Sequence, residues 1–182
     1  INLVQGLVNA GVQLDSTVLA AYESWCTASV NDPDPGFWGH WPRYYAEMPV
    51  KQDWIQAAAK RCQTAVVVIG RSAGEDRENT LKKGSFYLTN KEKALLDAVT
   101  TAFQKVVLVL NIGSIMDFAE IDAYGDKISA ILLAWQLGME SGNAVADVLT
   151  GQVNPSGRLT DTIAKTYADY PAQNFGNKAE NR

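Results

Sequence analysis

The stretch AVVVIG, Ala65 to Gly70, is an uninterrupted apolar run that leads directly into the polar segment RSAGEDREN, Arg71 to Asn79. Two further apolar runs follow, at Val106 to Leu110 and at Ile128 to Ala134. None of the three alternates between apolar and polar residues, which is typical of strands buried on both faces. Helical patterns separate the runs, so the sequence predicts a mostly parallel sheet with helices above and below it. We therefore expect an α/β fold, built as a three-layer α/β/α sandwich.

The helices between these strands have recognisable ends. Thr89 and Glu92 form a T-x-x-E capping box, which predicts a helix that runs to about Phe103. Asp15 and Ser16 are suited to cap an earlier helix. Further helices are expected before Gly11, after Pro49, at Met116 to Tyr124 and at Gly142 to Leu149.

Composition excludes several classes of protein. The 182 residues are 47% hydrophobic and 20% charged, which fits one globular domain. The net charge is −4 and the basic residues are scattered, so a nucleic-acid surface is not expected. No apolar run approaches the ~20 residues that span a bilayer, so no membrane partner is expected.

The cysteines, the single histidine and the first residues carry less information. Cys26 and Cys62 fit no zinc or redox spacing and are predicted to be buried free thiols, with a disulfide between them as the alternative. His40 alone does not support a histidine-based metal cluster, and no metal or cofactor is expected. The chain lacks an initiator Met and a signal peptide and begins as though within a helix, so we expect a piece of a longer protein whose compartment is undetermined. Residues 172–182 are polar and expected to be flexible.

In an open parallel sheet, functional sites lie beyond the carboxyl ends of the strands. Three segments there are candidates, at 70–88, 111–116 and 135–142. The first holds Glu75, Asp76 and Glu78, flanked by Arg71 and Arg77. A separate segment, residues 31–45, is a long loop with three prolines and five aromatic residues, among them Trp38.

Two catalytic interpretations compete at the first segment. Gly70 to Gly74 matches G-x-S-x-G, the serine-hydrolase elbow with Ser72 as nucleophile. That elbow needs a helix directly after it and a histidine to accept the proton, whereas a long loop follows and His40 precedes the serine. The interpretation in which a carboxyl group is catalytic is therefore favoured. The structural alternative for the acids is a solvated surface turn.

A longer match lies near the end of the chain. The segment WQLGMESGNAVADVLTGQVNPSGRLTDT, Trp135 to Thr162, resembles the second domain of family 3 glycoside hydrolases, the β-glucosidase and β-xylosidase group. AVVVIGRSAGED, KGSFYLT and VVLVLNIGS resemble the same domain in the same order. The resemblance covers about Ala57 to Pro171. The sequence departs from the common pattern at Leu137, Met139 and Ser141, which affects packing and no catalytic position.

The resemblance implies a flavodoxin-like α/β sandwich whose partner is a (β/α)8 barrel domain of the same enzyme. That family hydrolyses terminal β-linked sugars with retention, so the substrate would be a β-linked oligosaccharide or glycoside. The barrel carries the nucleophile, and the sandwich domain lends a Glu in an S-G-E or A-G-E context. Ala73-Gly74-Glu75 fits that context, which makes Glu75 the expected general acid/base. The isolated domain is then expected to be inactive.

Further substrate-binding candidates are Arg71, Asp76, Arg77, Trp135, Gln136 and Trp38. The structural alternatives are an ion pair for Glu75 with Arg71 or Arg77, core packing for Trp135, and a staple over the sheet edge for the aromatic loop. The rival function is a non-catalytic module of the same fold that binds carbohydrate or a partner protein. A serine esterase that uses Ser72 is a more distant alternative.

Overall fold

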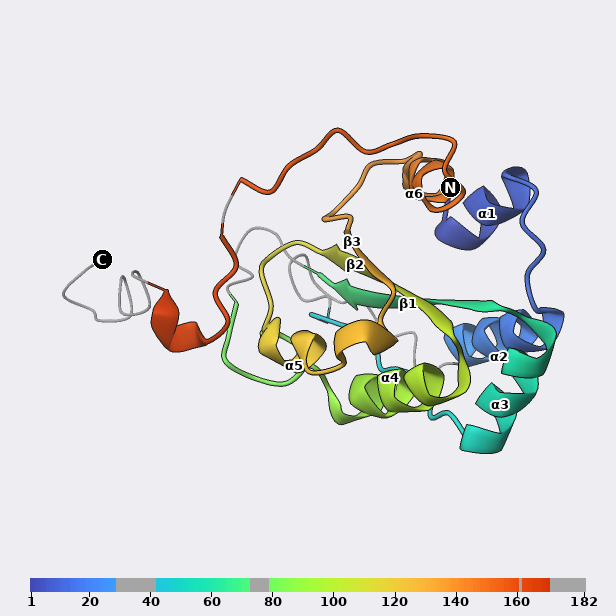
Figure 1. Ribbon diagram of the computed structural model, residues 1–182, viewed down its shortest axis with the longest axis horizontal. Helices are drawn as coiled ribbons and strands as arrows, with labels where there is room; N and C mark the ends of the chain where they lie inside the picture. The colour runs from blue at the N-terminus through green and yellow to red at the C-terminus, as the bar shows by residue number, and fades with distance from the viewer. Residues whose placement is uncertain (29–41, 73–78, 161, 171–182) are drawn as a thin grey trace.

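The structure is a computed structural model, and it describes residues 1–28, 42–72, 79–160 and 162–170. Three parallel strands form one sheet in the order β1-β2-β3: β1 spans Thr64–Arg71, β2 spans Lys105–Ile112 and β3 spans Ala130–Leu133. The α/β class and the parallel sheet are as predicted (Figure 1). The first two strands extend slightly beyond the predicted runs, and β3 is shorter than its run.

The register of the sheet brings the strand ends together. Arg71, the last residue of β1, is paired with Ile112 at the end of β2, and Gly70 is paired with Asn111. Leu110 of β2 is paired with Leu133 at the end of β3. The segments that follow the three strands therefore all begin at one edge, which is called the carboxyl edge below.

The core lies between the sheet and the helices on one side of it. Helices α3 (Gln52–Arg61), α4 (Asn90–Ala102) and α5 (Ala119–Asp122) contribute buried apolar side chains to this core. The predicted capping box begins α4: the Thr89 side chain accepts from the Glu92 N–H, and the Glu92 carboxylate accepts from the Thr89 N–H. The largest fully buried side chains include Ile69, Leu88, Leu96, Leu108, Leu110, Ile112, Met116 and Ile121.

The other face of β1 is open among the described residues. Val66 and Val68 are 38% and 41% exposed, and Ile131 of β3 is 42% exposed. The prediction that every strand is buried on both faces is therefore wrong for these positions. In the central strand, Val109 is buried. Val66, Val68 and Ile131 are exposed because α4 packs on the opposite face of the sheet, while two helices on their own side pack mainly on each other (Figure 1).

Those two helices are α1 (Leu3–Asn9) and α6 (Ser141–Leu149). The Gly142 N–H donates to the Ile1 carbonyl at 2.9 Å. A Cβ on Gly142 would lie 1.9 Å from the Asn2 carbonyl oxygen, and a Cβ on Gly6 would lie 2.0 Å from the Gly142 oxygen. The backbones thus approach closely enough to require glycine at both positions.

Helix α2 (Ser16–Thr27) begins at the predicted cap, where the Asp15 carboxylate accepts from the Thr17 and Val18 N–H groups. Arg61, at the end of α3, donates to the other Asp15 oxygen at 2.6 Å. Both cysteines are free. Cys62 is half-buried, whereas Cys26 is exposed because α2 contributes no buried residue to the core. The prediction of a buried thiol is wrong for Cys26.

In the part of the chain that the structure describes, no helix is both long and apolar enough to cross a membrane.

Candidate functional site

The predicted site residues divide into two groups. Arg71, Trp135 and Gln136 are described, whereas Glu75, Asp76, Arg77 and Glu78 lie in the segment 73–78 and Trp38 and His40 lie in 29–41, outside the described residues. The tail 172–182 also lies outside them. The site is therefore built from the residues that flank these segments.

Both ends of the segment 73–78 are fastened by hydrogen bonds. On one side, the Ser72 N–H donates to the Arg43 carbonyl at 2.6 Å. On the other side, the Asn79 amide donates to the Ile115 carbonyl at 2.6 Å, and its oxygen accepts from the Ser85 hydroxyl at 2.6 Å. Ile115 belongs to the segment that follows β2. Ser72 and Asn79, the described residues on either side of 73–78, therefore both lie at the carboxyl edge.

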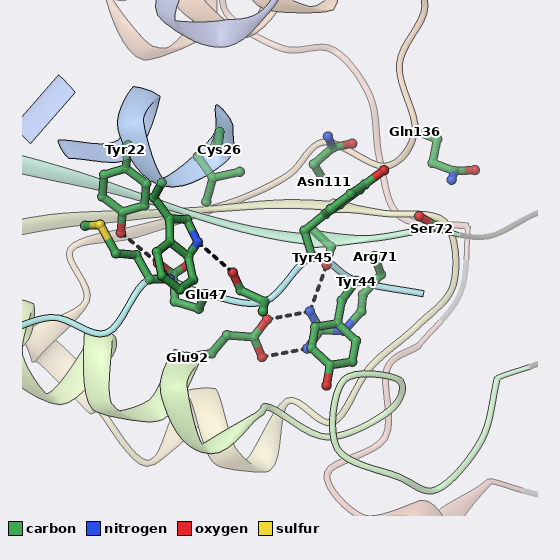
Figure 2. A pocket seen from close by; sticks show the side chains of 15 residues that line it. Tyr22, Cys26, Tyr44, Tyr45, Glu47, Arg71, Ser72, Glu92, Asn111 and Gln136 are labelled. Atoms are coloured by element: carbon green, nitrogen blue, oxygen red, sulfur yellow. Dashed lines mark hydrogen bonds and ion pairs between the residues drawn. The ribbon is translucent and has the colours of Figure 1, made fainter. Parts of the chain in front are cut away.

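Arg71 makes an ion pair that the sequence analysis did not predict. Its guanidinium donates to both oxygens of Glu92, at 2.6 and 2.8 Å, and the two side chains are 3% and 5% exposed. Figure 2 shows this two-pronged contact beside the ring of Tyr44, whose centroid lies 5.6 Å from the guanidinium carbon. Arg71 is thus engaged by Glu92. From the sequence alone, an acid of the 70–88 segment is the expected ionic partner of Arg71.

A cavity of about 570 Å³ opens beside this pair. Aromatic side chains from two parts of the chain line it, and it is reached by residues at the ends of β1 and β2 and by one residue of the segment after β3. Figure 2 shows Tyr22 and Glu47 at one end and Arg71, Ser72 and Gln136 at the other. Other lining residues include Trp25, Cys26, Tyr44, Tyr45, Gly70, Glu92 and Asn111. Of the five aromatic residues in the predicted loop, Tyr44 and Tyr45 are the ones in the described part of the chain.

Glu47 is the second carboxyl group of this cavity. Its Oε1 accepts from the Tyr22 hydroxyl and from the Met48 N–H, each at 2.8 Å. Burial raises the pKa of the Glu47 carboxyl above its ordinary 4.5, and these two hydrogen bonds oppose the rise only in part. Burial also raises the pKa of Tyr22, with the Glu47 charge as the second cause. A carboxyl group at this place holds a proton more readily than one in water.

The segment after β3 contributes two predicted residues in different ways. Gln136 lines the cavity, whereas Trp135 is not among its lining residues. Trp135 has φ of 57°, in the left-handed region that bulky residues rarely adopt. It is 36% exposed, so the alternative that placed it in the core is not supported. Strained backbone of this kind is concentrated at functional sites.

Among the site residues that sequence reasoning missed are Tyr22, Glu47 and Glu92. The sequence predicts only a capping role for Glu92. Its pairing with Arg71 depends on the burial of that arginine, which only the folded chain reveals. Nothing in the sequence pointed to Glu47. Among the described residues, no group of three or more His, Cys, Asp or Glu side chains is placed to hold a metal ion.

The fold and the position of the cavity define an α/β domain with a candidate site at the carboxyl ends of its parallel strands. The family described as "Glycosyl hydrolase family 3 C-terminal domain" matches residues 4–182. The chain therefore belongs to glycoside hydrolase family 3, and the resemblance seen in the sequence is confirmed. Ser72 as the nucleophile of an esterase gains no support from this assignment.

Relatives and solved structures agree with the family. A β-glucosidase of Ruminococcus albus is 41% identical over 177 residues, which are 97% of this chain and 18% of the relative. A β-glucosidase from Paenibacillus barengoltzii superposes with a TM-score of 0.88 at 36% identity, over 94% of this chain and 19% of that structure. β-Glucosidase 3B from Thermotoga neapolitana, in complex with glycerol, gives 0.79 at 33% identity, over 96% and 24%. The chain thus spans about a fifth of the length of these relatives.

Proposed function

We propose that this chain is the sandwich domain of a retaining β-glycosidase of the β-glucosidase type, and that Glu75 is its general acid/base. The observation that carries the proposal is the 41% identity to a β-glucosidase over 97% of the chain. The described geometry supports it, because both ends of the segment that contains Glu75 are hydrogen-bonded at the carboxyl edge. Sites of open parallel sheets lie at that edge.

The chemistry needs two carboxyl groups about 5–5.5 Å apart, one ionised and one protonated. The nucleophile would come from the (β/α)8 barrel domain that the family resemblance implies. It attacks the anomeric carbon while Glu75 gives its proton to the leaving oxygen, and the glycosidic bond breaks. Glu75, now a carboxylate, then takes a proton from water as the water attacks the glycosyl–enzyme ester, and both groups return to their first state.

The other candidate residues are assigned either to substrate binding or to positioning. Contact with a β-linked oligosaccharide or glycoside is proposed for Asp76, Arg77 and Trp38, and for Trp135 and Gln136 beyond β3. Gln136 has the support of lining the cavity. For Arg71, burial against Glu92 favours a role in positioning the loop over direct contact with substrate. No cofactor enters the reaction.

The experiment compares Glu75→Ala with wild type in the full-length enzyme, on two aryl β-glucosides. One substrate has a good leaving group and the other a poor one. Loss of a general acid should lower kcat/KM on the poor leaving group by on the order of 10²–10⁴-fold and spare the activated substrate in comparison. Glu78→Ala, which removes another acid of the same segment, is the matched control and should not separate the two substrates.

A non-catalytic binding module is the second candidate, and the cavity is the observation that favours it. Aromatic walls and amide, hydroxyl and carboxyl groups are suited to bind a sugar ring. The two proposals differ in what the isolated chain does. If the module is non-catalytic, the chain alone binds a glycoside with an affinity that Glu75→Gln leaves unchanged. If Glu75 serves a site shared with the barrel, the chain alone neither turns over nor binds glycoside detectably.

A further inference from the structure

The Arg71–Glu92 pair is almost wholly removed from water, so a gain in stability alone does not explain why the two charges are there. Taking two charges out of water costs several kcal/mol per ion, so a buried pair is weak support for stability. Such pairs are best explained by a geometry that they specify. The two parallel N–H···O contacts of 2.6 and 2.8 Å fix the guanidinium plane relative to the carboxylate.

The pair joins three separate segments of the chain. Arg71 is the last residue of β1, and its guanidinium also donates to the Gly70 carbonyl at 2.8 Å and to the Ser85 carbonyl at 3.3 Å. Glu92 lies in the first turn of α4 and accepts from the Thr89 N–H at 2.7 Å. The end of the strand, the segment around Ser85 and the start of the helix are thus held by one set of charged hydrogen bonds.

The same set reaches both ends of the segment that contains Glu75. Arg71 is bonded directly to Ser72, where that segment begins. At its other end, Asn79 accepts from the Ser85 hydroxyl, and the Ser85 carbonyl accepts from Arg71. Through Ser85, one buried guanidinium is therefore linked to Ser72 and to Asn79, the residues on either side of the segment.

The positive charge of Arg71 is compensated within the pair. Glu92 engages the guanidinium with both oxygens, and the ring of Tyr44 lies over it. Arg71 therefore anchors the end of β1 without leaving an uncompensated positive charge there.

We propose that Arg71 and Glu92 form a positioning pair for the general acid/base, holding both ends of the 73–78 segment while the two charges compensate each other. The inference rests on the proposed role of Glu75. Neither residue of the pair is required to touch the substrate.

The test uses the full-length enzyme with Arg71→Lys and, separately, Glu92→Gln. Lysine keeps the charge and loses the two-pronged contact, and glutamine keeps the shape and loses the charge. Each variant should lower kcat on the poor leaving group by about 10–100-fold, the loss typical of a misplaced catalytic group, with KM nearly unchanged and the activated substrate spared.

Arg61→Lys is the matched control, since Arg61 forms a 2.6 Å pair with Asp15 just before the start of β1, at the opposite end of that strand from Arg71. Rates are divided by the number of active sites, counted by labelling with an activated 2-fluoro glucoside, so that loss of folded protein cannot imitate the effect. An equal fall on both substrates, or no fall in either variant, overturns the positioning role. If Glu75→Ala separates the substrates and these variants do not, only the present inference fails; if Glu75→Ala itself does not separate them, the proposed function fails first.

Discussion

Two carboxyl groups lie beside the cavity, Glu92 buried and Glu47 half-buried, and their partners differ in charge. Glu92 faces the guanidinium of Arg71, whereas the direct hydrogen-bond donors to Glu47 are a neutral hydroxyl and a neutral backbone N–H. A nearby cation offsets part of the free energy lost when a carboxylate is removed from water, and neutral hydrogen-bond donors offset less of it. Glu47 is therefore the residue at which the fold should respond to pH.

Replacing Glu47 by glutamine should remove that response. In wild type the native state holds the Glu47 proton more tightly than the unfolded chain does, because burial raises its pKa. The Glu47 contribution to stability is therefore fully present below the ordinary value of 4.5 and is lost as pH rises through the raised native pKa. Glu47→Gln should gain stability relative to wild type as pH increases.

Urea unfolding of both proteins at steps between pH 4.5 and about pH 8 measures this difference. Glu23→Gln, which removes an exposed carboxyl from α2, corrects for the loss of one negative charge. A difference between Glu47→Gln and wild type that stays constant over this range would contradict the account of Glu47.

At the scale of the elements, the contact between α1 and α6 depends on two glycines. A Cβ on Gly142 would lie 1.9 Å from the Asn2 carbonyl oxygen, a separation that only movement of the helix backbone can relieve. Gly142→Ala should therefore destabilise the chain by about 1–3 kcal/mol, in the range of other overpacked positions.

Thermal and urea unfolding check this prediction. Gly138→Ala is the control, because a Cβ there meets no atom within 4 Å. The control should change stability by less than about 0.5 kcal/mol. Equal effects of the two substitutions would mean that the helices do not pack through Gly142.

Much of this element-level structure could be predicted from the sequence. The apolar runs located β1 and β2, and the T-x-x-E pattern located the start of α4, because these signals depend on neighbouring residues alone. The openness of one face at Val66 and Val68 could not be predicted in this way. An apolar side chain shows only a preference for burial, and which face is covered depends on helices distant in the sequence.

The candidate site was predictable to a smaller extent. Ser72 and Asn79 lie at the carboxyl edge because they follow a parallel strand, and the order of the elements in the sequence predicts this. The Arg71–Glu92 pair joins residues 21 positions apart through the turn that precedes α4, and no local pattern encodes it. The contact between Glu47 and Tyr22 likewise joins two segments with no repeating signal, so it emerged only from the folded chain.

At the scale of the whole molecule, this chain spans about a fifth of its β-glucosidase relatives. A retaining mechanism needs a nucleophile as well as an acid/base, and the proposal assigns the nucleophile to the barrel domain. The sandwich is then one half of a shared site, which contributes Glu75 on a segment anchored at both ends.

The most direct test of that claim is to add azide to the Glu75→Ala variant of the full-length enzyme while it hydrolyses an activated aryl β-glucoside. The variant should accumulate a glycosyl–enzyme intermediate, because no base remains to activate water. Azide needs no such base, so turnover should rise with azide concentration and the product should be a β-glucosyl azide of retained configuration. No acceleration and no azide product would contradict the account and place the acid/base elsewhere.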